Sequence, residues 1–176
     1  MTAFELQILD LIQKYMASPL MNTVMVFITS LGDYGILWII ITGILLFNSK
    51  TRKEGIASAI SLILCAIICN GILKPLVGRI RPCDLNTAVT LLVNRPPDYS
   101  FPSGHTASSF ASAVAIFASG NKKLGIVSIV IAFLIGFSRM YVYVHFPTDV
   151  LAGMMLGIML GVIGKILTDH TSTKNT

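Results

Sequence analysis

The chain alternates long apolar runs with short polar segments. With their helix ends, five runs can cross or nearly cross a hydrocarbon core of about 30 Å: Ile36–Phe47, Ile56–Leu73, Ala107–Ala118, Leu124–Phe137 and Val150–Leu167. Met21–Leu31 is a sixth, shorter candidate. The pattern predicts an all-α fold, a polytopic membrane helical bundle of about six transmembrane helices.

The segment before Pro19 has a different pattern. Its polar and apolar side chains fall on separate helical faces: Gln7, Asp10 and Lys14 against Phe4, Ile8, Leu11 and Tyr15. Such a helix lies along the membrane interface or begins a kinked first span, and we predict an N-terminal interfacial helix. Glu5 and Asp10 stand where a cleaved signal peptide carries basic residues, so no signal peptide is expected.

Composition agrees with a lipid environment. Hydrophobic residues make up 54% of the chain and charged residues 12%, too few charges to cover a soluble domain. No Gly/Ser-rich or Pro-rich linker divides the sequence, so one membrane-embedded domain, residues 1–176, is expected. The net charge of +5 contains no long basic run, which argues against nucleic acid binding. No obligatory protein partner is implied.

The basic residues predict an orientation, because short cytoplasmic loops carry an excess of Lys and Arg. With a cytoplasmic N-terminus and about six spans, the inside segments carry Lys14, Lys50, Arg52, Lys53, Lys122, Lys123, Lys165 and Lys174. The outside segments carry Lys74, Arg79, Arg81, Arg95 and Arg139. We therefore expect a multi-pass plasma-membrane protein with both termini in the cytoplasm and the second set of cations outside.

Three polar stretches fall at the ends of predicted spans, on one face of the membrane: 74–82, 101–105 and 138–149. They bring cations to the membrane boundary, where charge is costly unless it is paired or hydrated: Lys74, Arg81 and Arg139. Arg and Lys suit phosphate oxygens. Ser103 and Gly104 open a helix, whose backbone N–H groups and dipole can hold an anion. The predicted ligand is a phosphate group.

Two histidines are expected near this phosphate. His145 precedes Asp149 by four residues, so the carboxylate can bind one ring nitrogen and leave the other free to attack phosphorus. His105 begins another helix and is placed to protonate the leaving oxygen. No His and Cys spacing suits zinc, so neither a metal nor a cofactor is predicted.

Other polar residues are interpreted without a catalytic role. Asp33 is typical of a turn, and His170 lies in the polar tail. Arg79 is ambiguous and is left out of the predicted site. Asp84, Arg95 and Asp98 are interpreted as loop charges, although Arg95 is also a candidate for contact with a lipid headgroup.

The three stretches, complete and in order, resemble the signature of the phosphatidic acid phosphatase type 2 superfamily. The matching residues are Lys74, Arg81-Pro82, Pro102-Ser103-Gly104-His105, Ser138-Arg139, His145 and Asp149. The superfamily includes bacterial membrane lipid phosphatases and soluble vanadium haloperoxidases.

The resemblance implies a metal-independent phosphatase in which His145 becomes phosphorylated, Asp149 supports it and His105 is the general acid. It implies that Lys74, Arg81, Ser103, Gly104 and Arg139 bind the phosphoryl group. The short chain resembles bacterial undecaprenyl diphosphate and phosphatidylglycerophosphate phosphatases; phosphatidic acid is a third candidate substrate. A lipid phosphotransferase with the same chemistry, and a lipid transporter lined by the cations, remain alternatives.

Overall fold

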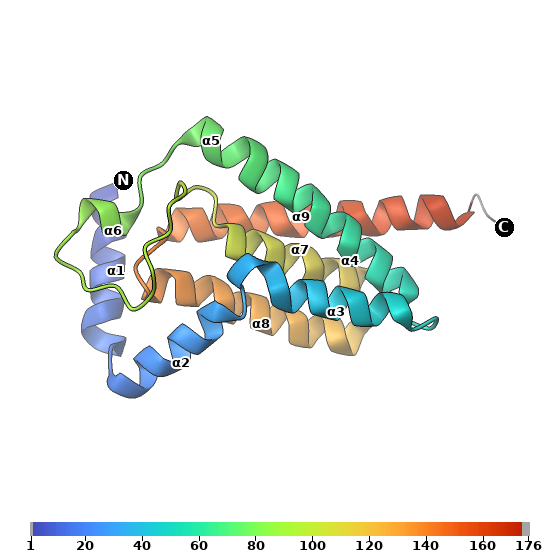
Figure 1. Cartoon of the computed structure of the whole chain (residues 1–176), viewed down its shortest axis with the longest axis horizontal. Helices are drawn as coiled ribbons and strands as arrows, with labels where there is room; N and C mark the ends of the chain where they lie inside the picture. Colours follow the sequence, from blue (N-terminus) through green and yellow to red (C-terminus); the bar gives the residue numbers. More distant parts are fainter. Residues whose placement is uncertain (1, 174–176) are drawn as a thin grey trace.

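A computed structural model describes residues 2–173, and this part of the chain is helical with no strand. The helices that lie side by side along the long axis are α3 (Ile36–Phe47), α4 (Arg52–Cys65), α7 (Gly104–Ala118), α8 (Lys122–Tyr141) and α9 (Pro147–Thr173) (Figure 1). Helix α1 (Thr2–Met16) lies across one end of this bundle, and α2 (Pro19–Ser30) leads from it to α3. The predicted all-α membrane fold is confirmed.

Helix α4 continues into the segment that forms the site. A π-helical stretch, Ala66–Leu73, follows it and runs into the short helix α5 (Lys74–Val77). Gly78 ends α5 in the left-handed conformation, with φ 59°, which glycine adopts without steric cost. The chain then reaches α6 (Pro82–Leu85) and a long loop without regular structure before α7.

Fewer helices than predicted are long enough to span a membrane. Within the described residues, Arg52–Leu85, Lys122–Tyr141 and Pro147–Thr171 have the length and apolarity of spans. Helices α2 and α3 have 12 residues each, which cover only about 18 Å. Together, with a 44° bend between them, they make one further candidate. The predicted count of about six is therefore not established.

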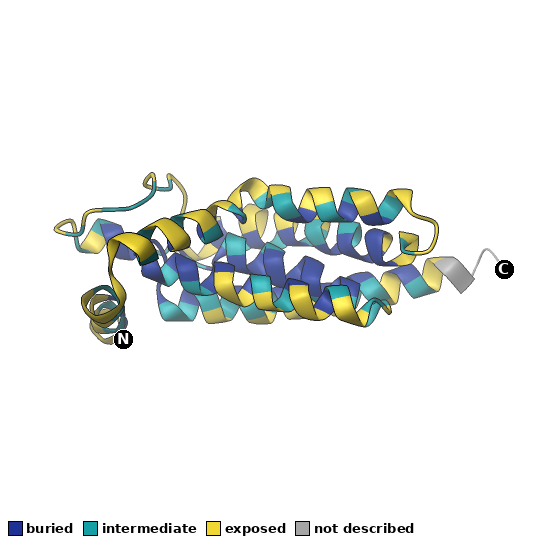
Figure 2. Ribbon diagram, turned by 90° about the horizontal axis from the view of Figure 1, so that it is seen from below, coloured by how far each residue is buried: buried dark blue, intermediate teal, exposed yellow. Residues whose placement is uncertain are grey.

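The exposed surface of the bundle is apolar. Figure 2 shows buried residues gathered between the helices, while exposed residues line the outer faces. Helix α3, for example, exposes Ile39, Ile40 and Ile44. A soluble protein rarely leaves so much contiguous apolar surface in water, so these faces suit a hydrocarbon environment.

Polar side chains inside the bundle form hydrogen bonds with one another. The hydroxyls of Thr42 and Ser58 lie 2.6 Å apart, and those of Ser58 and Ser112 lie 2.7 Å apart. The indole N–H of Trp38 donates to Ser109 Oγ at 2.8 Å. Because lipid tails offer no hydrogen-bond partners, these polar groups bond to one another, and the bonds between different helices help to hold the bundle together.

The described ends of the chain lie at opposite ends of the bundle (Figure 1). Helix α1 contacts the start of α9, where Glu5 accepts a hydrogen bond from the backbone N–H of Thr148 at 3.1 Å. Helix α9 is itself a candidate span and ends far from this contact. With α2 and α3 as one bent candidate span, this arrangement does not show that both termini lie on the cytoplasmic side.

Helix α9 packs closely on α7 through glycine. A Cβ added at Gly157 would lie 2.5 Å from the carbonyl oxygen of Ala107 and 2.7 Å from Phe110 Cβ, whereas one added at Gly43 would meet nothing within 4 Å. The absence of a side chain at Gly157 therefore sets the distance between the two helices.

We expect Gly157→Ala to destabilise the bundle by about 1–3 kcal/mol, because a backbone atom must move to admit the methyl group. Thermal unfolding in detergent measures the loss. Gly43→Ala is the matched control and should be neutral or slightly stabilising, since alanine is the better helix former. Equal midpoints for the two variants would contradict the packing argument.

Candidate active site

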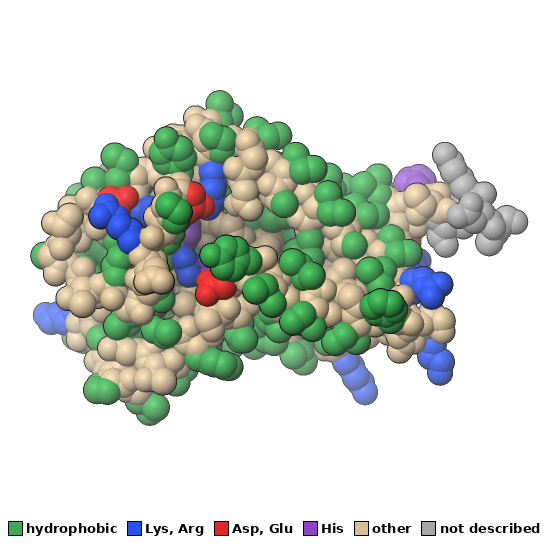
Figure 3. Space-filling view, in the orientation of Figure 1, with side chains coloured by type: hydrophobic (Ala, Val, Ile, Leu, Met, Phe, Trp, Pro, Cys, Tyr) green, Lys and Arg blue, Asp and Glu red, His purple; other side chains and the backbone are tan. Residues whose placement is uncertain are grey.

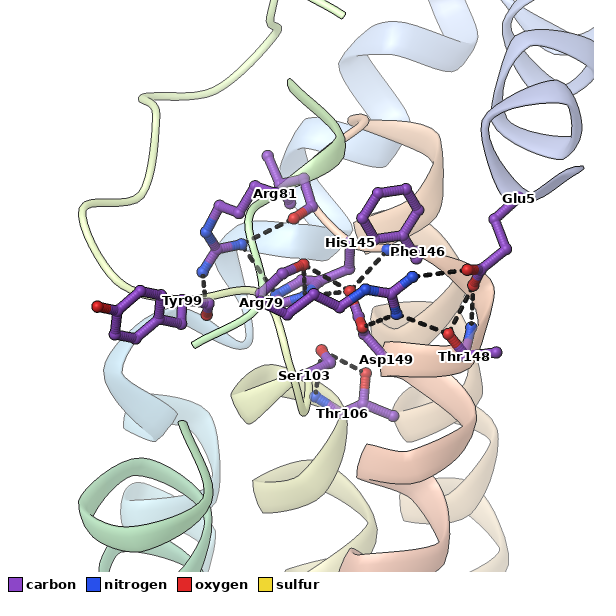
Figure 4. A network of polar contacts seen from close by, with 12 residues as sticks. Glu5, Arg79, Arg81, Tyr99, Ser103, Thr106, His145, Phe146, Thr148 and Asp149 are labelled. Carbon is purple, nitrogen blue, oxygen red and sulfur yellow. Dashed lines mark hydrogen bonds and ion pairs between the residues drawn. The ribbon is translucent and has the colours of Figure 1, made fainter. Parts of the chain in front are cut away.

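The predicted site residues converge at the end of the bundle that α1 covers. Lys74 begins α5, Arg81 lies just before α6, and Ser103 caps α7. His145 lies between α8 and α9, and Asp149 lies in the first turn of α9. Figure 4 shows Arg81, Ser103, His145 and Asp149 from these elements close to one another.

His145 is fully buried and has distinct partners on its two ring nitrogens. Arg81 Nη1 lies 3.2 Å from Nε2. A guanidinium only donates, so Nε2 carries a lone pair and Nδ1 carries the proton. Nδ1 lies 3.5 Å from Ser100 Oγ and 3.6 Å from Asp149 Oδ2. The nitrogen with the lone pair therefore faces the cations.

Burial keeps this imidazole neutral. Removal from water lowers the pKa of His145 to about 3, against the opposing effect of Asp149, while the charges of Arg81 and Arg139 lower it further. Because the shift is downward, the ring binds a proton only in strong acid. At neutral pH Nε2 can therefore act as a nucleophile.

Asp98 bridges two of the predicted phosphate-binding cations. One of its carboxylate oxygens pairs with Lys74 Nζ, and the other lies 2.6 Å from Arg81 Nη2. Partial burial raises the pKa of Asp98, but Lys74 and Arg81 outweigh this effect and hold it at about 2. The ionised carboxylate thus pairs with two of the cations that are predicted to bind phosphate.

Arg139 is a buried cation with an incomplete set of partners. Its Nη1 donates to Thr29 Oγ1 at 2.6 Å, but Nε has no hydrogen-bond partner in the part of the chain that is described. Within that part, no carboxylate forms an ion pair with Arg139. Burying such a group is costly, and an anion would satisfy it.

His105 contacts the turn between α2 and α3. Its Nε2 lies 2.9 Å from Asp33 Oδ1. A Cβ added at Gly32 would lie 2.6 Å from the same ring, so this turn packs tightly against the imidazole. Asp33, interpreted from the sequence only as a turn residue, is therefore also the partner of His105.

The polar groups of Ser103 are engaged within the protein. Its backbone N–H donates to the carbonyl oxygen of Asp149 at 3.0 Å, and its Oγ accepts from the hydroxyl of Thr106 at 2.9 Å. The Ser103 N–H is therefore engaged within the protein, and anion binding by Ser103 and Gly104 stays a prediction. Ser103 also caps α7, and Gly104, which follows it, lies beside Lys74.

Several residues at the site were not predicted. Arg79 lies 2.5 Å from Asp149 Oδ1, and Ser100 donates to Asp149 Oδ2 at 2.5 Å. Glu5 pairs with Arg79 at 2.6 Å. Glu5 lies 144 residues before Asp149, and no local spacing signals that they approach. Arg79 stood within the first polar stretch, but its role was not apparent from the sequence.

The site is polar and open on one face. Figure 3 shows Lys or Arg, Asp or Glu, and His atoms together in a hollow surrounded by apolar side chains. A neighbouring cavity of about 280 Å³ is lined by Arg79, Arg81, Arg95, Asp98 and Tyr99, among others. Among the described residues, no group of three or more His, Cys, Asp or Glu side chains is placed to hold a metal ion.

Comparisons with known proteins show the family of the chain. A family model described as the PAP2 superfamily matches residues 55–170. The chain is 37% identical to an undecaprenyl-diphosphatase of Sulfolobus acidocaldarius, over 88% of this chain and 73% of that protein. It is 34% identical to phosphatidylglycerophosphatase B of Bacillus subtilis, over 84% of this chain and 75% of that protein.

A solved structure of a PAP2-type phosphatase has a similar fold. The crystal structure of a transmembrane PAP2-type phosphatidylglycerolphosphate phosphatase from Bacillus subtilis superposes with a TM-score of 0.78 and 29% identity. The match covers 96% of this chain and 86% of that chain.

We expect Asp98→Asn to bind orthovanadate at least about tenfold more tightly, a change of about 1.4 kcal/mol. The substitution removes the charge that competes for Lys74 and Arg81 but keeps the Asp98 carbonyl, which accepts from Arg81 Nε at 2.8 Å. Isothermal titration calorimetry measures the affinity. Asp84→Asn, which removes the loop carboxylate paired with Arg95, is the matched control. Unchanged or weaker binding by Asp98→Asn would show that Asp98 is not a competitor.

Proposed function

The chain belongs to the PAP2 superfamily and is a membrane lipid phosphatase, and we propose that His145 takes the phosphoryl group from a lipid diphosphate and passes it to water. The excess of buried positive charge carries this proposal. Lys74, Arg81 and Arg139 are all buried, and Asp98 is the carboxylate that pairs with two of them. A phosphate dianion would balance this charge.

In the first step, Nε2 of His145 attacks phosphorus. A P–N bond forms, the bond from phosphorus to the leaving oxygen breaks, and His105 gives its proton to that oxygen. The tautomer of His145 supports this role, because its lone pair lies on the side of Arg81. Charge on the phosphoryl oxygens is stabilised by Lys74, Arg81 and Arg139.

In the second step, water releases the phosphate. His105, now neutral, takes a proton from water as its oxygen attacks phosphorus, and the P–N bond breaks. Burial, followed by the charge of Arg139, lowers the pKa of His105 to about 4 against the opposing effect of Asp33, so the ring is neutral and able to accept the proton of water. Asp33 Oδ1, 2.9 Å from Nε2, and the negative charge of a bound phosphate would favour the protonated ring that the first step needs. Asp149 keeps Nδ1 of His145 protonated throughout, so the same nitrogen can react again.

The proposed substrate is a polyprenyl diphosphate of the undecaprenyl type. The relative named undecaprenyl-diphosphatase matches 88% of this chain. The apolar outer faces suit a substrate whose tail stays in lipid. Phosphatidylglycerophosphate is the second candidate, because the relatives include phosphatases named for it.

The proposed orientation places the site on the outer side of the plasma membrane. The turns at the opposite end of the bundle carry Lys50, Arg52 and Lys53, and Lys122 and Lys123. Positive charge in short loops favours the cytoplasm. The C-terminal end of α9 is then cytoplasmic, and α1 lies at the outer surface beside the site.

The test is phosphate release by the detergent-purified protein from undecaprenyl diphosphate, phosphatidylglycerophosphate and phosphatidic acid, with EDTA present. We expect undecaprenyl diphosphate to be hydrolysed fastest. His145→Ala should lose at least about 10³-fold in kcat, since it lacks the nucleophile.

Each result decides a different part of the proposal. Equal activity of His145→Ala would exclude the histidine mechanism. Loss of activity in EDTA, restored by added metal, would exclude a metal-free reaction. Release that requires an acceptor lipid would show a phosphotransferase, and faster release from phosphatidylglycerophosphate would correct the substrate.

A further inference from the structure

Arg79 connects the proposed catalytic pair to helix α1. Its Nη1 lies 2.5 Å from Asp149 Oδ1, and its Nη2 lies 2.6 Å from Glu5 Oε2. The guanidinium also stacks 4.0 Å from the centre of the Phe146 ring, next to His145. Figure 4 shows these side chains in one row, from the start of α9 to α1.

The two carboxylate oxygens of Asp149 accept hydrogen bonds from different donors. Oδ1 accepts from Arg79, whereas Oδ2 accepts from Ser100 and from the backbone N–H of Phe146 at 2.9 Å. Oδ2 is also the oxygen nearest to Nδ1 of His145. With both oxygens held, the carboxylate cannot rotate away from the imidazole.

Glu5 holds Arg79 from the other side. Its carboxylate is buried, with 3% of the residue exposed, and Thr148 binds it through both the backbone N–H at 3.1 Å and the hydroxyl at 2.6 Å. Burial raises the pKa of Glu5, but the bonds from Thr148 and Arg79 outweigh it and lower the pKa overall. A buried carboxylate whose partners are Arg79 and Thr148 is stable only while α1 stays in place.

We propose that Arg79 is a positioning residue for Asp149, that Glu5 fixes Arg79, and that helix α1 is therefore part of the active site. This inference rests on the proposed phosphohistidine reaction. Helix α1 exposes Phe4, Leu11 and Tyr15 on its outer face, so the helix that carries Glu5 also presents apolar side chains to the lipid surface. Neither Arg79 nor Glu5 touches the phosphoryl group in this account.

The test compares Glu5→Gln and Arg79→Ala with the wild-type protein, using a C15 prenyl diphosphate in detergent. Loss of a hydrogen bond to a charged group predicts kcat lower by about 10- to 100-fold. KM should stay within about twofold, because Lys74, Arg81 and Arg139 still bind the phosphate. Guanidinium chloride should restore several-fold activity to Arg79→Ala, since Arg79 lines the open cavity.

Asp10→Asn is the matched control. It also replaces a carboxylate on α1 by an amide, and Asp10 accepts from the Tyr143 hydroxyl at 2.7 Å, but it does not contact Arg79. We expect its kcat to stay within about twofold of wild type, because the Asp149 contacts are intact. Orthovanadate affinity, which should be unchanged in Glu5→Gln, checks that the variant folds.

The outcomes are separable. Wild-type kcat in Glu5→Gln would overturn the inference and leave the proposed function standing. Two results would show that α1 matters only for folding. One is an equal loss of kcat in Asp10→Asn and Glu5→Gln. The other is loss of orthovanadate binding by Glu5→Gln together with failure of guanidinium to restore activity to Arg79→Ala. Absence of phosphate release from the wild-type protein would instead refute the proposed function.

Discussion

Buried positive charge in a lipid-facing bundle is the constraint on which the site depends. Lys74, Arg81 and Arg139 lose water at the end of the bundle, and isolated charges cannot persist in such an environment. Asp98 compensates part of this charge in the resting protein, while Arg139 keeps an unpaired Nε among the described residues. Among the described residues, the buried positive charge is thus only partly compensated.

Local spacing explains why much of the site is visible in the sequence. Asp149 follows His145 by four residues, with Pro147 starting α9 between them, and Ser103 caps α7. Lys74 and Arg81 lie on one continuous segment after a predicted span. Side chains at helix ends are positioned by the helices themselves, so the all-α fold and the convergence of these residues follow from pattern alone.

The features of the site that the sequence does not predict depend on contacts between residues far apart in the chain. Asp33 meets His105 across 72 residues, and Glu5 meets Thr148 across 143. Asp98 pairs with Lys74 and Arg81 across 24 and 17 residues, and Arg79 pairs with Asp149 across 70. Each separation exceeds the turn or helix spacing that assigns a partner from the sequence, so the sequence indicates only a loop charge at Asp98 and an ambiguous cation at Arg79. Hydropathy alone does not show whether the two 12-residue helices α2 and α3 form one bent span or two, so it does not establish on which side each terminus lies.

The most direct test of the account is to find the phosphoryl group on His145. In His105→Ala, p-nitrophenyl phosphate still has a leaving group that needs no proton, but water lacks its general base, so phosphoenzyme should accumulate. An alkaline quench followed by peptide mass spectrometry locates the modification. The account predicts phosphate on His145 and on no other residue. Phosphate elsewhere, or turnover without any phosphoenzyme, would contradict it.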